Sequence, residues 1–492
     1  MKKLLLASVP VLALSAGAAF AQSNPAETGK NVAPGSDAVI QQIGSGNNIS
    51  TFNQTVSDSS SANYSEIFQG STSGNTSSAG GTVSMTQLAT SGAANSSRVY
   101  QTGNIQTATI TQNSLGSGSF VSSIEQTGGS NNTVTVSQGV LTFNADGTVA
   151  TNTAITGGAY SGVLQQGTNG QVTVNQTAAG VSSTVQQTAG DKNLASVTQA
   201  SVGASSTITQ SGSGDGTTIN ATVKQSSGSG NASFIGQSGY DDYVLVNQAG
   251  GGTDNSSVTQ SGQLDQANVL QYSMASSSAI TQSGKSDQAT VHQWAGSNVS
   301  GITQTGGTDV ATVLQSGNTS GVSYITQAGM ADQASVTQYG ATSNNSSISQ
   351  LDLNDYAIVN QGGLAGYNSS GINQGGGGNG GNIATIMQTA NYAGSQNLSS
   401  ITQGGGATAT VTQTVNNGAF INNSGITQNG QNTVTVTQDA EDANNSSTIN
   451  QSLSAAGSTT NTILLSQTSN LAANASNITQ SGFNNYVKVT QK

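Results

Sequence analysis

Glutamines recur at a fixed spacing through the middle of the chain: Gln260, Gln271, Gln282 and Gln293 follow one another at intervals of eleven residues. A carboxamide both donates and accepts hydrogen bonds, so identical glutamines stacked on one another can form a continuous ladder. A buried glutamine is costly unless it is paired in this way. The spacing therefore predicts structural ladders, and the glutamines expected in them are Gln260, Gln271, Gln282, Gln293, Gln304, Gln315, Gln327, Gln338, Gln350, Gln361, Gln480 and Gln491.

Residues suited to catalysis or metal binding are scarce. The chain has no cysteine and a single histidine, His292, which takes a position that Leu270 and Leu314 occupy in neighbouring repeats. We therefore interpret His292 as an incidental solvent-facing residue, with no Ser-His-Asp or metal constellation around it. The glycine run at 375–378 lacks the Lys-Ser/Thr of a phosphate loop. We expect no catalytic, cofactor or metal site, and no enzymatic activity.

The segments that carry the glutamines alternate between apolar and polar residues. Ser256, Val258 and Gln260 share one face, and Ala267 and Val269 share another with the next glutamine. A period of two is typical of strands, and residues 256–293 hold two copies of a strand, a tight turn and a second strand. A repeat of about 22 residues is the pattern of a solenoid, in which each copy forms one rung.

A single rung is too small to be stable. Burial of its few aliphatic side chains gives about 1.5–3 kcal/mol each, whereas ordering its residues costs about 1.5 kcal/mol per residue. Stacked rungs pair their strands above and below, at a spacing of about 4.8 Å. The sequence thus predicts an all-β fold, a β-solenoid of about 18 strand-turn-strand repeats over residues 38–492.

The turns between paired strands also repeat. A glycine stands two residues after the first glutamine, where we expect a positive φ, and an aspartate or asparagine follows three residues later, where it can bond to the turn backbone. We expect the aligned aspartates to repel one another and slow assembly. The turn residues so predicted are Gly262, Gly284, Gly306, Gly329, Gly482, Asp265, Asp287, Asp309 and Asp332.

Charge and composition exclude some functions. The formal net charge is −11, with only 9 Lys and Arg, which excludes a nucleic-acid binder that works by neutralising phosphates. Without cysteine, stability must come from backbone pairing and side-chain stacking.

The first 21 residues resemble a secretory signal peptide. Lys2 and Lys3 precede an apolar run, and small residues lead to a cleavage position after Ala21. A membrane anchor is the weaker alternative because the apolar run is short, and we expect no transmembrane segment in the mature chain. Residues 22–37 are polar and are expected to form a flexible arm before the first rung. Residues 139–160 are expected to form a loop on the rim of the solenoid, and the Ser/Gly-rich residues 71–81 make the second rung doubtful.

The repeated motif Gln-x-Gly-x-x-(Asn/Asp)-x-Ala-x-x-x-Gln occurs at residues 260–271, 282–293, 304–315 and 327–338. It resembles the curlin repeat of bacterial curli fibres, and the match is strongest over residues 233–361 and again at 476–491. The resemblance implies a secreted functional-amyloid subunit of the extracellular biofilm matrix, used in surface adhesion and cell aggregation. It implies as partners further copies of the chain, a major or minor curlin, and the curli secretion machinery, with residues 22–37 serving secretion.

Ice binding and cell-surface adhesion are two other functions to which a β-solenoid is suited. Ice binding would need two matched outward columns of threonine, but beside Thr259, Thr281 and Thr303 the neighbouring column varies. A monomeric cell-surface adhesin or stalk remains the alternative to a fibre subunit. Such a chain is expected to have a capped end or a C-terminal membrane barrel, and neither is visible in the sequence.

Overall fold

A computed structural model describes most of the chain from residue 30 onward. The described residues are 30–31, 37–43, 48–56, 59–70, 81–115, 118–143, 149–153, 157–212, 218–272, 274–317, 320–340, 343–375, 381–452, 460–470, 472–482 and 484–492. The expected signal peptide and most of the expected flexible arm lie outside this set.

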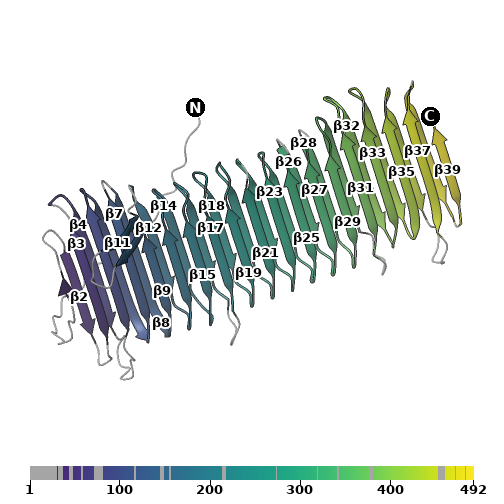
Figure 1. Cartoon of the computed structure of the whole chain (residues 1–492). Coiled ribbons are helices and arrows are strands. Elements are labelled where there is room, and N and C mark those ends of the chain that lie inside the picture. Colours follow the sequence, from purple (N-terminus) through teal and green to yellow (C-terminus); the bar gives the residue numbers. More distant parts are fainter. Residues whose placement is uncertain are drawn as a thin grey trace, which may run out of the picture.

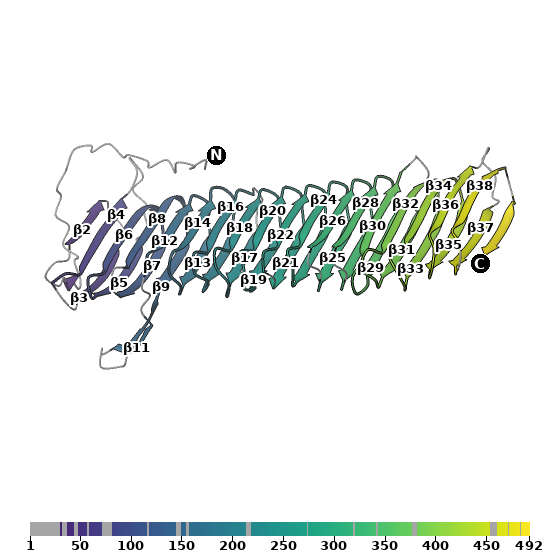
Figure 2. The ribbon, with the colours of Figure 1, turned by 90° about the horizontal axis from the view of Figure 1, so that it is seen from above.

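The structure is an elongated β-solenoid, as predicted (Figure 1). Each rung contributes one strand to each of two facing sheets, and each strand pairs in parallel with its equivalents in the rungs before and after (Figure 2). The two sheets hold 36 long parallel strands, so the described residues form 18 rungs, in agreement with the predicted number. These residues contain no helix, and thus no helix able to span a membrane.

The first strands of the rungs form one sheet. Its strands are β2 (Asp37–Ile43), β4 (Ala62–Gly70), β6 (Ala94–Asn104), β8 (Ser119–Ser130), β12 (Ala159–Gln165), β14 (Val181–Gln187), β16 (Ser205–Gln210), β18 (Ala232–Gln237), β20 (Asn255–Gln260), β22 (Ser277–Gln282), β24 (Val299–Gln304), β26 (Ser320–Gln327), β28 (Ser343–Gln350), β30 (Tyr367–Gln374), β32 (Gln396–Gly404), β34 (Ile421–Asn429), β36 (Asn445–Ser452) and β38 (Asn474–Ser481).

The second strands form the opposite sheet. They are β3 (Ile49–Val56), β5 (Thr82–Thr90), β7 (Thr107–Leu115), β9 (Thr133–Gln138), β13 (Gln171–Gln176), β15 (Leu194–Gln199), β17 (Asn220–Gln225), β19 (Tyr243–Gln248), β21 (Gln266–Tyr272), β23 (Gln288–Trp294), β25 (Val310–Ser316), β27 (Gln333–Tyr339), β29 (Tyr356–Gly362), β31 (Ile383–Ala390), β33 (Thr408–Val415), β35 (Asn432–Ala440), β37 (Asn461–Ser469) and β39 (Tyr486–Gln491).

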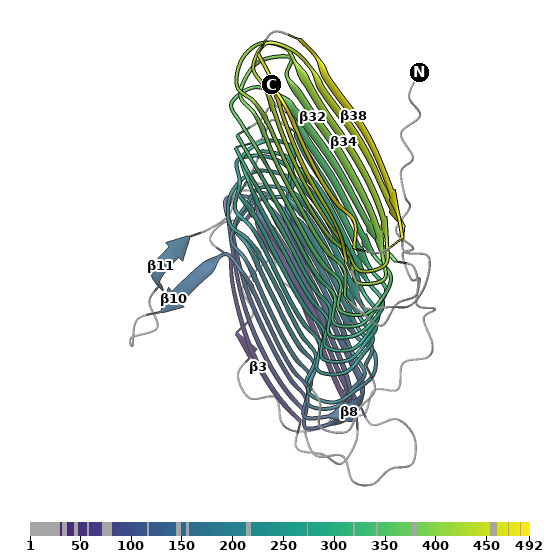
Figure 3. The ribbon, with the colours of Figure 1, turned by 90° about the vertical axis from the view of Figure 1, so that its right-hand side faces the viewer.

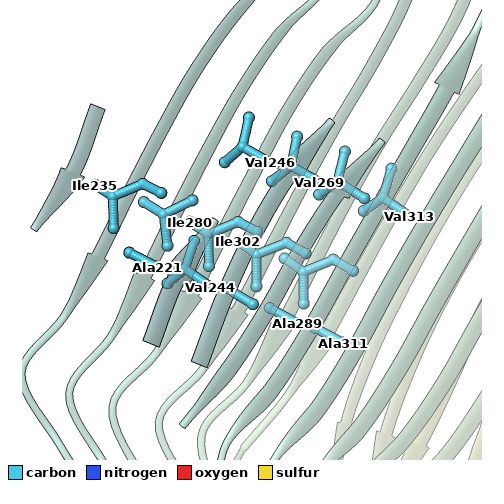
Figure 4. Packing of buried hydrophobic residues seen from close by; sticks show 14 of the residues in the cluster. Ala221, Ile235, Val244, Val246, Val269, Ile280, Ala289, Ile302, Ala311 and Val313 are labelled. Carbon is cyan, nitrogen blue, oxygen red and sulfur yellow. The ribbon is translucent and has the colours of Figure 1, made fainter. Parts of the chain in front are cut away.

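The core is a stack of aliphatic side chains between the two sheets. Ile280 and Ile302 from the first sheet and Val269 and Val313 from the second are at most 1% exposed (Figure 4). The register is in phase from rung to rung, so Ile280 pairs with Ile302 and every inward residue lies over its equivalent. Each rung therefore completes the cores of its two neighbours, which is why the aliphatic pattern repeats without interruption.

Three segments differ from the sequence predictions. The stretch 139–160, expected to be a plain loop, contains an antiparallel hairpin of β10 (Val140–Phe143) and β11 (Val149–Thr153), which projects away from the solenoid (Figure 3). The second rung, which the Ser/Gly-rich stretch 71–81 made doubtful, is formed by β4 and β5. Within the expected flexible arm, β1 (Lys30–Asn31) pairs with Phe52 and Asn53 of β3. Long-range pairing explains the second rung and β1, whereas the hairpin forms by pairing between nearby residues; local composition reveals none of the three.

The core predicts a sharp contrast between neighbouring side chains. Ile302→Ala removes buried volume that the flanking rungs cannot refill, and we expect the free energy of unfolding to fall by about 2–5 kcal/mol. Thr303→Ala, one residue later on the outward face, should change it by less than about 0.5 kcal/mol. Hydrogen exchange in β22, β24 and β26 measures both, and equal effects of the two substitutions would contradict the inward–outward assignment.

Candidate functional site

Eighteen glutamines, one near the C-terminal end of each strand of the first sheet, form one uninterrupted ladder. In every link, Nε2 of one glutamine donates to Oε1 of the glutamine in the next rung, over 2.7–3.2 Å. The predicted members are all in it: Gln260, Gln282, Gln304, Gln327, Gln350 and Gln480. The first and last members are Gln42 and Gln480.

A second ladder runs through the opposite sheet from Gln54 to Gln491. Its seventeen links have the same direction, from Nε2 to the Oε1 of the next rung, and span 2.6–3.0 Å. The predicted members here are Gln271, Gln293, Gln315, Gln338, Gln361 and Gln491.

The amides have further partners in the facing sheet. Nε2 of Gln282 also donates to the backbone carbonyl of Gln266 in the facing strand at 3.1 Å, and Nε2 of Gln293 donates to that of Ser277 at 3.2 Å. Both Nε2 hydrogens of such a glutamine are thereby used, one along the stack and one across it. The ladders thus join the two sheets as well as the successive rungs.

Both ladders are polar, and their end members are incomplete. Among the described residues, Nε2 of Gln480 in the last rung is buried with no hydrogen-bond partner, and so is Oε1 of Gln54 in the first rung. One end of the solenoid therefore presents an unused amide donor and the other an unused amide acceptor. The strand edges match this pattern, because β2 pairs only with β4 and β39 only with β37 in the described part of the chain.

The turn glycines have a different role from the one predicted. Gly482 has a φ of 94°, but Gly262, Gly284, Gly306 and Gly329 are not among the residues with positive φ. At these four a Cβ would overlap the backbone carbonyl of the next rung's turn, for example that of Gly329 above Gly306. Glycine is required there by the closeness of the adjacent turn rather than by its own backbone angles.

Positive φ occurs instead two residues after these glycines. Leu264, Ser286, Thr308 and Ala331 have φ values between 59° and 62°, and Asn354, which follows Asp352 at the same place in the next turn, has a φ of 58°. Sequence analysis missed these positions because their residue types vary, and only one of the five is an asparagine, a type that tolerates this conformation. The tight stacking of the turns holds them in it.

The turn aspartates also differ from expectation. Asp265, Asp287, Asp309 and Asp332 are fully buried, so they are not exposed edge charges. Their Oδ1 atoms accept from the backbone N–H of the equivalent residue in the next rung, and the N–H of the glycine three residues earlier in the same turn also approaches each carboxyl. Burial raises the pKa of Asp265 to about 7 and that of Asp309 to about 6, although approaching backbone N–H groups partly oppose the shift.

His292 lies where the sequence places it, in an outward column with Leu270 and Leu314. Its ring is 5.8 Å from that of Trp294, and partial burial lowers its pKa. In the described part of the chain, no group of three or more His, Cys, Asp or Glu residues is arranged to hold a metal ion. The groups that recur from rung to rung are hydrogen-bond donors and acceptors, and among the residues that the structure describes some of them are left unpaired at the two ends of the solenoid.

A comparison of the sequence with models of known protein families, and a search of curated proteins, found no match.

The ladder predicts that removing a central glutamine destabilises the rungs next to it. Gln304→Ala leaves Nε2 of Gln282 and Oε1 of Gln327 without their ladder partners in a buried setting, at a cost of about 1–3 kcal/mol for each orphaned group. Gln288→Ala, at an exposed position on β23, is the matched control and should have little effect. Faster amide exchange confined to β22, β24 and β26 of the Gln304 variant is the expected result; unchanged exchange would show that the ladder adds no stability.

The turn geometry predicts opposite outcomes at two adjacent glycines. Gly306→Ala forces the turn of the next rung to move and should destabilise the stack by about 1–3 kcal/mol. Gly307→Ala is the control, since its Cβ would meet its nearest neighbour, the carbonyl oxygen of Lys285, at an ordinary 3.6 Å. Denaturant titration of both variants checks this, and equal stability of the two would refute the close-approach explanation.

Proposed function

We propose that the chain is a structural subunit that assembles head to tail into extracellular fibres. The observation that carries the proposal is the uniform direction of both glutamine ladders, which leaves an amide donor at one end and an amide acceptor at the other. An in-register contact between the two ends would continue both ladders and both sheets. Because such a contact repeats without closing, it propagates as a filament.

The two ends have matching registers. If the last rung of one subunit stacks on the first rung of another, Gln480 meets Gln42 in the first sheet, and Gln491 meets Gln54 in the second. Backbone groups on the edges of β38 and β39 then pair with those of β2 and β3. This is strand addition, in which main-chain hydrogen bonds supply affinity and aligned side chains supply register.

The resemblance to curlin repeats supports the same function from the sequence. On that basis we propose export by a signal peptide at 1–21, passage through a dedicated secretion system, and location in fibres at the bacterial cell surface. A major or minor curlin would be the natural heterologous partner, because its rungs would present the same ladder. Within biofilm matrix, such fibres would serve adhesion and cell aggregation without enzymatic activity.

A monomeric adhesin or stalk is the second candidate. It is favoured by β1, which pairs with Phe52 and Asn53 and so covers two residues of the edge that the next subunit would use. For a fibre to grow at this end, β1 would have to move away from β3, or the next subunit would have to pair with the remaining residues of β3. The two functions differ in whether purified chains associate.

The direct test is a time course of purified chain, followed by thioflavin T fluorescence and electron microscopy. A fibre subunit should show a lag, then growth into unbranched fibres, and preformed fibres should shorten the lag of fresh chain. A protease-resistant β-rich particle that stays monomeric under the same conditions would instead support the adhesin.

The end rung predicts a specific defect in growth. Gln480→Ala combined with Gln491→Ala removes two interface hydrogen bonds, and each should slow elongation by about threefold to tenfold. The combined Gln288→Ala and Gln333→Ala variant removes two exposed glutamines from β23 and β27 and should elongate normally. Seeded elongation rates check this; equal rates for the two double variants would exclude the C-terminal rung as a growing end.

A further inference from the structure

One column of the turns is aspartate in the middle of the solenoid and asparagine in several of the other rungs. The position lies at or immediately before the start of the second strand of each rung. Six consecutive rungs carry Asp242, Asp265, Asp287, Asp309, Asp332 and Asp355. Asparagine takes the position at Asn132, Asn193, Asn382, Asn432, Asn461 and Asn485, and other rungs carry Gln106, Gly170, Ile219 and Ala407 there. All six aspartates are at most 1% exposed.

Aspartate and asparagine use their first oxygen in the same way. Oδ1 of Asp265 accepts from the backbone N–H of Asp287 at 3.1 Å, and Oδ1 of Asn461 accepts from that of Asn485 at 2.9 Å. The column therefore links each rung to the next through an acceptor oxygen that both residue types possess.

Aspartate and asparagine differ in the second polar atom of the side chain, which is Oδ2 in aspartate and Nδ2 in asparagine. Nδ2 of Asn485 donates to the backbone carbonyl of Ser481 at 3.0 Å, and Nδ2 of Asn193 donates to that of Ala189 at 2.7 Å, in each case four residues earlier. Oδ2 of each of the six aspartates is buried and makes no hydrogen bond of good geometry, although the backbone N–H three residues earlier approaches each carboxyl. The equivalent carbonyl for Asp265 belongs to Ser261, and an ionised carboxylate has no hydrogen to donate to it.

The surroundings of the column oppose negative charge. Successive carboxyls are one rung apart, about 4.8 Å, in a buried setting, and Asp241 and Asp352 add further negative charge at its two ends. Lys285 lies in the same turns, but its side chain is exposed, and Asp254 belongs to the opposite arc of the rung. Burial raises the pKa of all six carboxyls, to about 7 for Asp332 and about 6 for Asp242.

We propose that these six aspartates make the central block of the solenoid proton-dependent. In the protonated stack each is a neutral acid whose Oδ2–H donates to the carbonyl four residues earlier, as the side-chain amides of Asn193 and Asn485 do. Ionisation removes this donor and places like charges on successive rungs. The inference concerns the folded chain itself and does not depend on fibre formation.

The direction of the pH effect follows from the raised pKa values. Between about pH 4 and pH 7 the folded block holds protons that the unfolded chain has released. Its stability therefore falls as the pH rises through this range and levels off above it. Because neighbouring carboxyls interact, the protons are lost in a broad, coupled titration rather than in one step.

Hydrogen exchange as a function of pH tests the proposal on the intact chain, after correction for the intrinsic exchange rate. The equilibrium constant for opening β19 to β29 should rise by up to about tenfold per pH unit for each proton released between pH 4 and pH 7. Strands β33 to β37, whose rungs lack aspartate at this column position, serve as the internal reference and should change far less. Equal pH dependence in the two blocks would overturn the proposal.

Substitution of aspartate by asparagine distinguishes an effect of protonation from an effect of side-chain shape. Asp265→Asn, Asp287→Asn, Asp309→Asn and Asp332→Asn together restore an N–H donor at each position and should abolish most of the pH dependence. Asp442→Asn, which alters an exposed carboxyl in another turn, should leave it intact. A fourfold variant that keeps the wild-type pH dependence would refute the role of the column.

Infrared spectroscopy supplies a readout that does not require a variant to match the wild type in stability. At pH 5.5 exposed carboxyls are mostly ionised, so the C=O stretch of a neutral carboxylic acid reports buried protonated groups. The folded wild-type chain should show this band, and the denatured chain should largely lose it. Its absence from the folded chain would contradict the proposal.

Discussion

In-register stacking of a buried amide is the constraint on which the rest of this structure depends. Each rung is too small to stabilise itself, so its inward side chains must be completed by the rungs above and below. A glutamine that fills this role must find an amide partner on both sides, since an unpaired buried amide is costly. That requirement fixes the residue type at two positions in every rung and gives both ladders a single direction from Gln42 and Gln54 toward the last rung.

The turns obey the same constraint in a different way. Adjacent turns approach so closely that Gly306 has no room for a side chain beneath the carbonyl of Gly329. The space left by glycine is next to the buried carboxyl of Asp309, whose Oδ1 binds the backbone of the next rung. The backbone, the glycine and the aspartate thus form one contact that repeats from turn to turn. Because the aspartate belongs to this contact, its ionisation changes the stability of the stack.

Much of the fold could be predicted because its repeat is visible in the amino-acid sequence. The alternation at Val258 and Val269 and the spacing of Gln260 and Gln271 define strands, inward faces and rung length. The contents of a turn could not be predicted equally well, because they depend on the neighbouring turn and not on local sequence. Positive φ at Leu264 and the bond from the backbone of Asp287 to Asp265 both arise between rungs. The projecting β10–β11 hairpin, likewise, has no counterpart in the repeat.

The central claim is that the donor end of one solenoid stacks in register on the acceptor end of another, and the absence of natural cysteine makes this measurable by disulfide trapping. Thr479 and Gln41 are exposed neighbours of Gln480 and Gln42, and the proposed contact places them one rung apart, about 4.8 Å, within the Cα range of a disulfide. Oxidised fibres of chains carrying both Thr479→Cys and Gln41→Cys should contain ladders of covalent multimers linked only between position 479 and position 41. Fibres linked instead through 41–41 or 479–479 pairs, or fibres with no linkage, would contradict the account.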